Sequence, residues 1–341
     1  MKLIELHILQ SYPVSCLNRD DVGAPKSATF GGVSRARISS QCLKRAVRLA
    51  AAEESPENFK GIRSRFLKGP FQAALQKAGL SESDAVKKAD EICAEFSKQD
   101  GKNKDQVTTA VYLSPGEIAQ IAQSIHAGED VKKAIKKAQR LDAADIALFG
   151  RMVANDATLN VEGAAMFSHA LSTHKTSNDI DFYSAVDDRK ADAEDAGAGM
   201  IGTLEFTSAT YYRYAAVNLG LLTDDKHLGA LPPEHRRAIL KSFLKATLMA
   251  VPGARKNSMN AATLPFAVLG IRKDKCQPVQ LVNAFESPVK ATGKGFDQAS
   301  REAMEADHKK LKDTWGIETS KELWMPETNL NDFLEGLTDG L

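Results

Sequence analysis

Residues 15–48 carry the sequence SCLNRDDVGAPKSATFGGVSRARISSQCLKRAVR, which holds seven basic residues and two acidic ones. The whole chain has a formal net charge of +1, so this basic excess is local. Alternation over 33–38 predicts a strand. Ser39 or Ser40 is then typical of a helix N-cap. Helical spacing places apolar residues on one face and polar or basic residues on the other, namely Gln41, Lys44, Arg45 and Arg48.

The start of this predicted helix has the chemistry of an anion site. Free backbone N–H groups, hydroxyls and cations gather there, and phosphate is the anion that fits best. In the preceding strand, Arg35 and Arg37 are two residues apart, so both are expected to project from one face. The alternative is a solvated basic surface, which most charge runs form. The pattern favours a site for a polyanion.

Composition bounds the class of protein. The chain has 341 residues, of which 43% are hydrophobic and 26% charged, as in ordinary globular proteins. Because the chain is nearly neutral, nucleic-acid binding would need segregated charge. The four cysteines form no CxxC pair, which makes a reducing cytoplasm the expected compartment. No apolar run approaches the ~20 residues of a membrane span.

Periodicity predicts an α+β fold with a helical block inserted after the first helix. The predicted helices cover 59–80, 81–98, 130–140, 162–173, 233–251 and 296–314, with a further helix capped by Ser114. The predicted strands cover 2–9 (with one buried face), 142–149, 203–219, 264–272 and 280–285. Residues 176–202 are rich in Gly, Asp and Ser and are too long for an ordinary connection, which favours a protruding functional loop.

A second basic surface is predicted on the helix over 130–140. Four lysines share one side of it, namely Lys132, Lys133, Lys136 and Lys137. An ordinary solvated face and a non-specific duplex contact are both consistent with this pattern.

Several of these stretches, in order along the chain, resemble one known family. They are CLNRDD (16–21), FGG (30–32), RxRISSQxLKRAxR (35–48), DIALFGRM (145–152), DIDFYSAVDD (179–188), GTLEFTSATYYRYAAVNL (202–219), VPGAR (251–255) and LVNAFESPV (281–289). Together they are similar to the type I-E CRISPR Cascade backbone subunits, the CasC-like family. The resemblance covers most of the chain.

The resemblance implies one domain over 1–341 with insertions. Its palm would be RRM-like (ferredoxin-like) and formed by about 1–52, 141–175 and 203–341. Residues 53–140 would form helical fingers, and residues 176–202 would form a thumb loop.

The resemblance also implies a non-catalytic, RNA-binding subunit without a metal or other cofactor. Such subunits polymerise head-to-tail along the spacer of a guide RNA (crRNA), beside other Cascade subunits, and present it to target DNA. The expected phosphate contacts are Arg19, Lys26, Ser39, Gln41, Lys44, Arg45 and Arg48. The expected wedge residues, which separate bases, are Met152, Tyr183, Ser184 and Val186. The lysines of 130–140 are then possible contacts to target DNA.

A metal-dependent ribonuclease is the alternative function. Asp20 and Asp21, with Asp179 and Asp181, could supply carboxylates for a metal ion. Acidic residues in loops are more often caps and turn residues. Residues 197–202 also match GxGxxG, but a strand pattern follows them rather than a helix, which disfavours a dinucleotide site.

Overall fold

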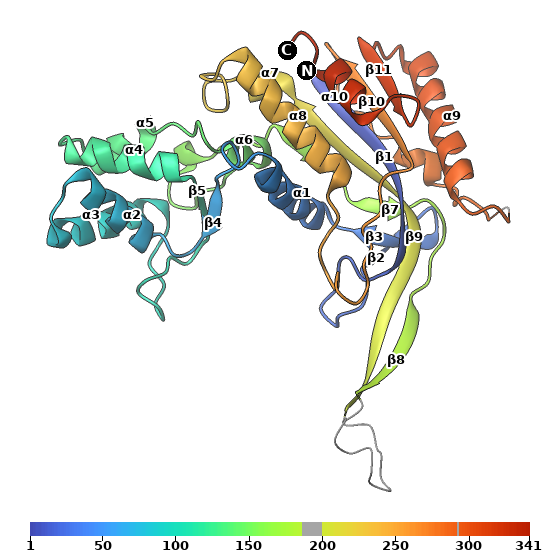
Figure 1. Ribbon diagram of the computed structural model, residues 1–341, viewed down its shortest axis with the longest axis horizontal. Helices are drawn as coiled ribbons and strands as arrows, with labels where there is room; N and C mark the ends of the chain where they lie inside the picture. The colour runs from blue at the N-terminus through green and yellow to red at the C-terminus, as the bar shows by residue number, and fades with distance from the viewer. Residues whose placement is uncertain (186–199, 292) are drawn as a thin grey trace, which may run out of the picture.

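The computed structural model describes residues 1–185, 200–291 and 293–341. Figure 1 shows a body built on a long sheet, a helical lobe to one side of it, and a two-stranded arm that extends from the body. The mixed architecture with antiparallel strand pairing agrees with the predicted α+β class.

The sheet of the body is antiparallel and centred on its longest strands. Its order is β11 (Lys321–Met325), β10 (Ala267–Lys273), β1 (Leu3–Ser15), β9 (Met200–Asn218), β7 (Ala170–Ser172), β3 (Val33–Ile38) and β2 (Ser27–Phe30), with β6 (Ala165–Phe167) also on β9. In the middle of the sheet, Leu6 lies opposite Gly270 on one side and Ala215 on the other. Both neighbours of β1 come from the second half of the chain, so the pairing of β1 connects the two halves of the chain.

Two helices cover one face of this sheet. They are α1 (Ser40–Glu54) and α8 (Pro233–Met249), which pack against each other. Their apolar faces, with Val47 and Phe243, meet Ile4 and Leu6 of β1 in the main hydrophobic core. Burying this area from water is the main stabilising term of the body.

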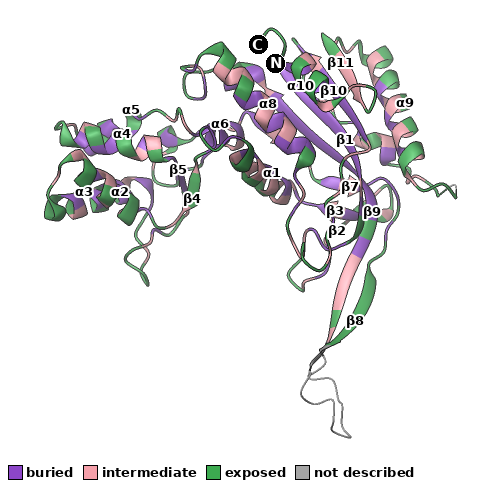
Figure 2. Cartoon of the chain, in the orientation of Figure 1, coloured by how far each residue is buried: buried purple, intermediate pink, exposed green. Residues whose placement is uncertain are grey.

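The opposite face of the sheet is covered as well (Figure 2). There η2 (Val282–Phe285) and α9 (Asp297–Trp315) pack over Tyr212, Tyr214 and Leu9. Strand β1 is therefore buried on both faces, and the prediction of one buried face for residues 2–9 is wrong. The sheet aromatics are not available for stacking with bases on this side.

The helical lobe has its own hydrophobic core. Its elements are β4 (Ile62–Ser64), α2 (Lys68–Ala78), α3 (Glu82–Phe96), β5 (Val111–Leu113), α4 (Pro115–His126), α5 (Val131–Lys137) and η1 (Ala157–Leu159). Its core runs from Leu67 to Leu159. The predicted helix start at Ser114 is confirmed, because the Ser114 hydroxyl accepts the Glu117 N–H at 3.1 Å.

Four sequence predictions of secondary structure are wrong. The first part of the predicted helix 59–80 contains β4. The predicted strand 142–149 is the helix α6 (Ala144–Phe149), the predicted helix 162–173 contains β6 and β7, and the predicted strand 280–285 contains η2. A short apolar run is consistent with both the helical and the strand periodicity, so its tertiary contacts decide whether it forms a helix or a strand. Here β6 and β7 form strands because both pair with β9.

The arm contains the predicted protruding segment. Strand β8 (Asp179–Ala185) pairs antiparallel with the first part of β9, and Tyr183 lies opposite Gly202. Val186 and residues 197–199 of the GxGxxG match lie outside the described residues. The described part of the segment is a β-ribbon.

The remaining helices are α7 (Leu219–Leu222), which follows β9, and α10 (Leu330–Thr338), which packs on β10, β11 and α8. In the described part of the chain, no helix combines the length and apolarity needed to cross a membrane.

Candidate nucleic-acid interface

The start of α1 is fixed by side-chain caps. The Ser39 hydroxyl accepts the Cys42 N–H at 3.2 Å, so the predicted N-cap is confirmed. The side-chain oxygen of Asn18 accepts the Ser39 N–H at 2.8 Å. Ser39 is largely buried, and its role in the free chain is to anchor the loop 16–21 to the helix.

An open groove of about 940 Å³ runs beside α1. Four predicted phosphate-contact residues line it, namely Gln41, Lys44, Arg45 and Arg48. Met152, the predicted wedge after α6, lines the same groove and is 80% exposed. The structure thus brings together residues that are far apart in the sequence.

The sequence did not predict the other lining residues, and three of these carry a guanidinium or a phenol group. Arg63 and Tyr112 come from the paired strands β4 and β5, and Arg151 precedes Met152. Arg151 is buried and donates to the Glu117 carboxylate at 2.8 Å, so it is internally paired. Arg63 is exposed and adds a cation to the groove. The sequence around Arg63 is an ordinary polar stretch, so only the pairing of β4 with β5 shows that Arg63 lies at the groove.

The basic residues around the start of α1 form no ion pair with a described residue. Among ion pairs between described residues, none includes Arg19, Lys26, Lys44, Arg45 or Arg48. Burial lowers the pKa of the Lys44 ammonium, since partial desolvation disfavours its charged form. A nearby anion would favour the charged form. The groove is therefore suited to a phosphate chain.

Two of these cations lie over aromatic rings instead. The Lys44 Nζ is 5.9 Å from the centroid of Phe167, and the Arg48 Cζ is 5.4 Å from that of Tyr112. A ring attracts a cation without cancelling its charge.

A second groove, of about 1080 Å³, lies on the other side of α1. Arg19 lines it, as does Lys256 just after the VPGAR stretch, and Arg45 lines both grooves. Lys26 lines neither groove. It precedes β2, where its backbone N–H donates to the Asn18 carbonyl at 2.8 Å.

Arg35 is a correction to the predicted basic surface. Its guanidinium is fully buried and donates to the carbonyls of Ser172 and Phe285, at 2.9 and 2.7 Å. Arg37 is partly exposed and donates to the Ser27 carbonyl at 3.1 Å. Arg35 supports the fold because η2 covers the strand where it projects.

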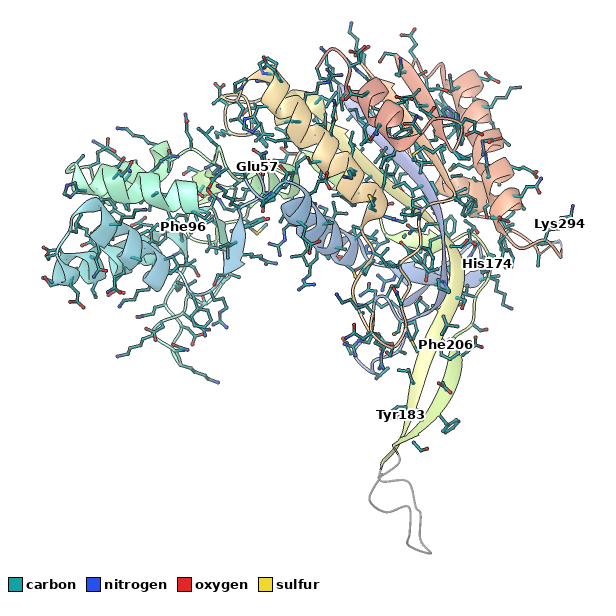
Figure 3. The ribbon with its side chains drawn as sticks, viewed as in Figure 1. Glu57, Phe96, His174, Tyr183, Phe206 and Lys294 are labelled. Carbon is teal, nitrogen blue, oxygen red and sulfur yellow. The ribbon has the colours of Figure 1, made fainter. Side chains whose placement is uncertain are left out.

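The arm carries the other predicted wedge residues. Tyr183 and Ser184 are exposed on β8, and Phe182 beside them is 74% exposed. Figure 3 shows Tyr183 far along the arm, away from the body. Within one chain, the structure therefore does not bring Tyr183 to the groove that holds Met152.

The lysines of α5 are mostly paired. Lys132 lies 3.7 Å from Glu95 and Lys136 lies 3.8 Å from Asp156, while Lys137 pairs with Glu129. These side chains are exposed, so each pair contributes little stability. Lys133 is exposed and is in no ion pair with a described residue.

Asp20, a candidate metal ligand, has a turn role. One carboxylate oxygen accepts the N–H groups of Val22 and Ala24, at 3.0 and 2.9 Å. Asp179 and Asp181 lie on β8. Within the described ranges, no three His, Cys, Asp or Glu side chains gather as a candidate metal site.

Comparisons with known proteins concern the family and the fold. The sequence matches the CT1975-like protein family over residues 4–335. One solved chain, described as "CRISPR RNA-guided surveillance complex, pre-nicking", is 27% identical, with a TM-score of 0.78 over 96% of this chain and 94% of that one.

A second solved chain, described as "CRISPR RNA-guided surveillance complex", is 24% identical, with a TM-score of 0.68 over 96% of this chain and 93% of that one, and shows the fold alone. No curated protein sequence matches significantly. The chain therefore belongs to the CT1975-like protein family, as a type I CRISPR Cascade backbone subunit.

Proposed function

We propose that this chain is a non-catalytic subunit that binds guide RNA by its phosphates and polymerises along the spacer. The groove beside α1 carries the proposal. Lys44, Arg45 and Arg48 line it without carboxylate partners among the described residues, and the apolar Met152 lies beside them. The similar solved chain comes from an RNA-guided surveillance complex, which supports RNA as the ligand.

Phosphate contacts explain how one surface can hold any spacer sequence. They grip and position a strand without reading its bases. Base edges then stay free to pair with target DNA, which is where guide complexes obtain their specificity. Met152, and Phe182 and Tyr183 on the arm, would insert between bases, an interaction worth about 1–3 kcal/mol per stacked base.

The arm supports head-to-tail polymerisation. Its exposed Ile180, Phe182 and Tyr183 lie on a strand that extends from the body, where the Tyr183 ring lies over Gly202 of β9. An arm on one copy and a groove on another make a heterologous contact, which generates a helical filament when the rotation does not close.

An RRM-like palm is supported by the order of the body elements. β1, α1, β6–β7, β9, α8 and β10 follow in sequence, and β9 and β10 flank β1 in space. This order supports a ferredoxin-like connectivity. Its RNA surface would be the α1 edge, because α9 covers the sheet face.

Contact between target DNA and α5 is the weaker part of the proposal. Three of the four lysines already have acidic partners, and only weak surface pairs would have to exchange for phosphate. Lys133 is the lysine that we expect to matter most.

The test of the RNA groove is the double variant Lys44→Gln, Arg48→Gln, with Lys132→Gln, Lys136→Gln as the matched control. We expect the first to lose affinity for single-stranded RNA and to reduce the slope of log K against log salt by about 1.4, since each phosphate contact contributes about 0.7. The control should keep both quantities. Normal RNA binding by the first variant would contradict the groove.

The non-catalytic part of the proposal rests on the turn role of Asp20. Bound RNA incubated with Mg²⁺ should stay intact. Cleavage that disappears in Asp20→Ala or Asp21→Ala would show a ribonuclease instead.

A further inference from the structure

Two cations of α1, one helical turn apart, lie over aromatic rings that belong to other elements. Lys44 lies over Phe167 of β6, at 5.9 Å, and Arg48 lies over Tyr112 of β5, at 5.4 Å. The two cations are four residues apart, so they share one face of α1 and both line the groove of about 940 Å³. One ring belongs to the body and the other to the helical lobe.

Each ring is itself held in place. The Tyr112 hydroxyl donates to the buried Asp145 carboxylate at 2.6 Å, and Asp145 also accepts the Gly61 and Ile146 N–H groups, at 3.3 and 3.1 Å. The Tyr112 ring is therefore held in place by its hydrogen bond to Asp145.

Phe167 is fixed by packing. Its centroid is 6.1 Å from that of Phe149 and 6.2 Å from that of Phe243, in the main core. Neither ring can turn away from its cation without disturbing buried contacts.

An aromatic ring and a carboxylate beside Lys44 or Arg48 would affect phosphate binding differently. A carboxylate would order the cation but would neutralise it, and a phosphate would then have to break that pair. The ring quadrupole orders the cation while its full charge stays available. Less side-chain freedom is then lost when RNA binds, which is preorganisation.

We propose that Phe167 and Tyr112 are positioning residues that hold Lys44 and Arg48 over the groove for RNA phosphates. The inference rests on the proposed function of the groove. It adds that two neutral rings, which themselves need not touch RNA, set the affinity of the cations.

The test is a double-mutant cycle with a fluorescently labelled single-stranded RNA at fixed salt. Phe167→Leu removes the ring and keeps an apolar side chain. It should weaken binding about threefold to tenfold in the Lys44 protein, in line with typical cation–π interactions, and by less than twofold in a Lys44→Ala background. Tyr112→Leu should show the same dependence on Arg48.

Tyr112→Phe separates the ring from its hydroxyl. We expect a lower melting temperature, because Asp145 loses a hydrogen-bond donor, with RNA affinity within about twofold of the original. An affinity loss as large as that of Tyr112→Leu would overturn the role of the ring.

A shape-preserving variant covers the risk that Phe167→Leu does not fold. Pentafluorophenylalanine at position 167 keeps the ring but reverses its quadrupole. It should weaken RNA binding only while Lys44 is present. Equal losses with and without Lys44 would overturn the inference and leave the groove assignment standing. If Lys44→Ala by itself had no effect on RNA binding, the groove assignment would fail too.

Discussion

Neighbouring basic residues of 15–48 differ in what surrounds their charges. Arg35 is enclosed by backbone carbonyls, whereas Lys44 and Arg48 lie over rings at the edge of a groove. A cation in the first situation stabilises the fold, because its removal leaves buried acceptors without a donor. A cation in the second is available to a ligand.

This difference predicts that substitution of Arg35 affects stability, whereas substitution of Lys44 affects RNA binding. Arg35→Leu should lower the free energy of unfolding by about 3 kcal/mol or more, since several buried carbonyls lose their donor. Lys44→Gln should change it by less than about 0.5 kcal/mol while it weakens RNA binding. Chemical denaturation of both variants measures the first quantity. Equal stability of the two would contradict the structural role of Arg35.

At the scale of elements, the β2–β3 turn docks onto the segment after η2. Gly31 has φ +58°, and a Cβ there would lie 1.7 Å from the Glu286 carbonyl oxygen. Gly32 has φ +74°, but a Cβ there would meet nothing within 4 Å. The two glycines share the left-handed backbone and differ in the space around them.

They therefore form a matched pair for mutation. Gly32→Ala should cost about 1–2 kcal/mol of folding stability, from backbone strain alone. Gly31→Ala should cost about 1–3 kcal/mol more, because backbone must also move. Thermal melts of both variants measure the difference. Equal losses of stability in the two variants would show that Gly31 is not in close contact with Glu286.

The contact between α9 and β11 should depend on pH. Burial raises the pKa of Glu322, but hydrogen bonds from Lys312, Thr319 and His308, at 2.5, 2.7 and 3.3 Å, outweigh it and lower that pKa to about 2. A carboxylate whose pKa is lowered in the folded state stabilises it above the unfolded pKa, near 4.5.

The stabilisation from Glu322 should therefore be lost as the pH falls from about 4.5 towards 2. We expect a loss of about 2 kcal/mol from this group, less than the full shift would give because the carboxylate is partly exposed. Denaturation at a series of pH values would show a shallower fall for Glu322→Gln than for the original protein. An identical pH profile would remove Glu322 as a contributor.

At the scale of the whole molecule, the groove beside α1 that holds Met152 lies where the body meets the helical lobe. Its α1 side belongs to the body, and its Arg63 and Tyr112 side belongs to the lobe. The arm carries exposed aromatic side chains away from both (Figure 3). Within a single chain, the arm and the groove lie apart.

Assembly should follow the length of the RNA. The mass of the complex, measured by light scattering, should roughly double when the RNA length doubles, because each copy covers a fixed stretch. Lys44→Gln, Arg48→Gln should stay monomeric with both RNAs. A complex of constant mass would contradict polymerisation along RNA.

Local signals let the sequence determine much of this protein. The Ser39 and Ser114 caps, the strand over 33–38 and the separation of charge on α1 all depend on residues within one or two turns, and the structure confirms them. The family signature is equally local, because it lies in short contiguous stretches.

The tertiary structure alone decided which segments share a surface. Residues 165–167 and 170–172 became strands because β9 offered partners, and Arg35 became a core residue because η2 covers it. Met152 and Tyr112 joined α1 at one groove through contacts between distant segments. Burial, strand pairing and the surroundings of a charge are properties of the packed chain, so no window of the sequence contains them.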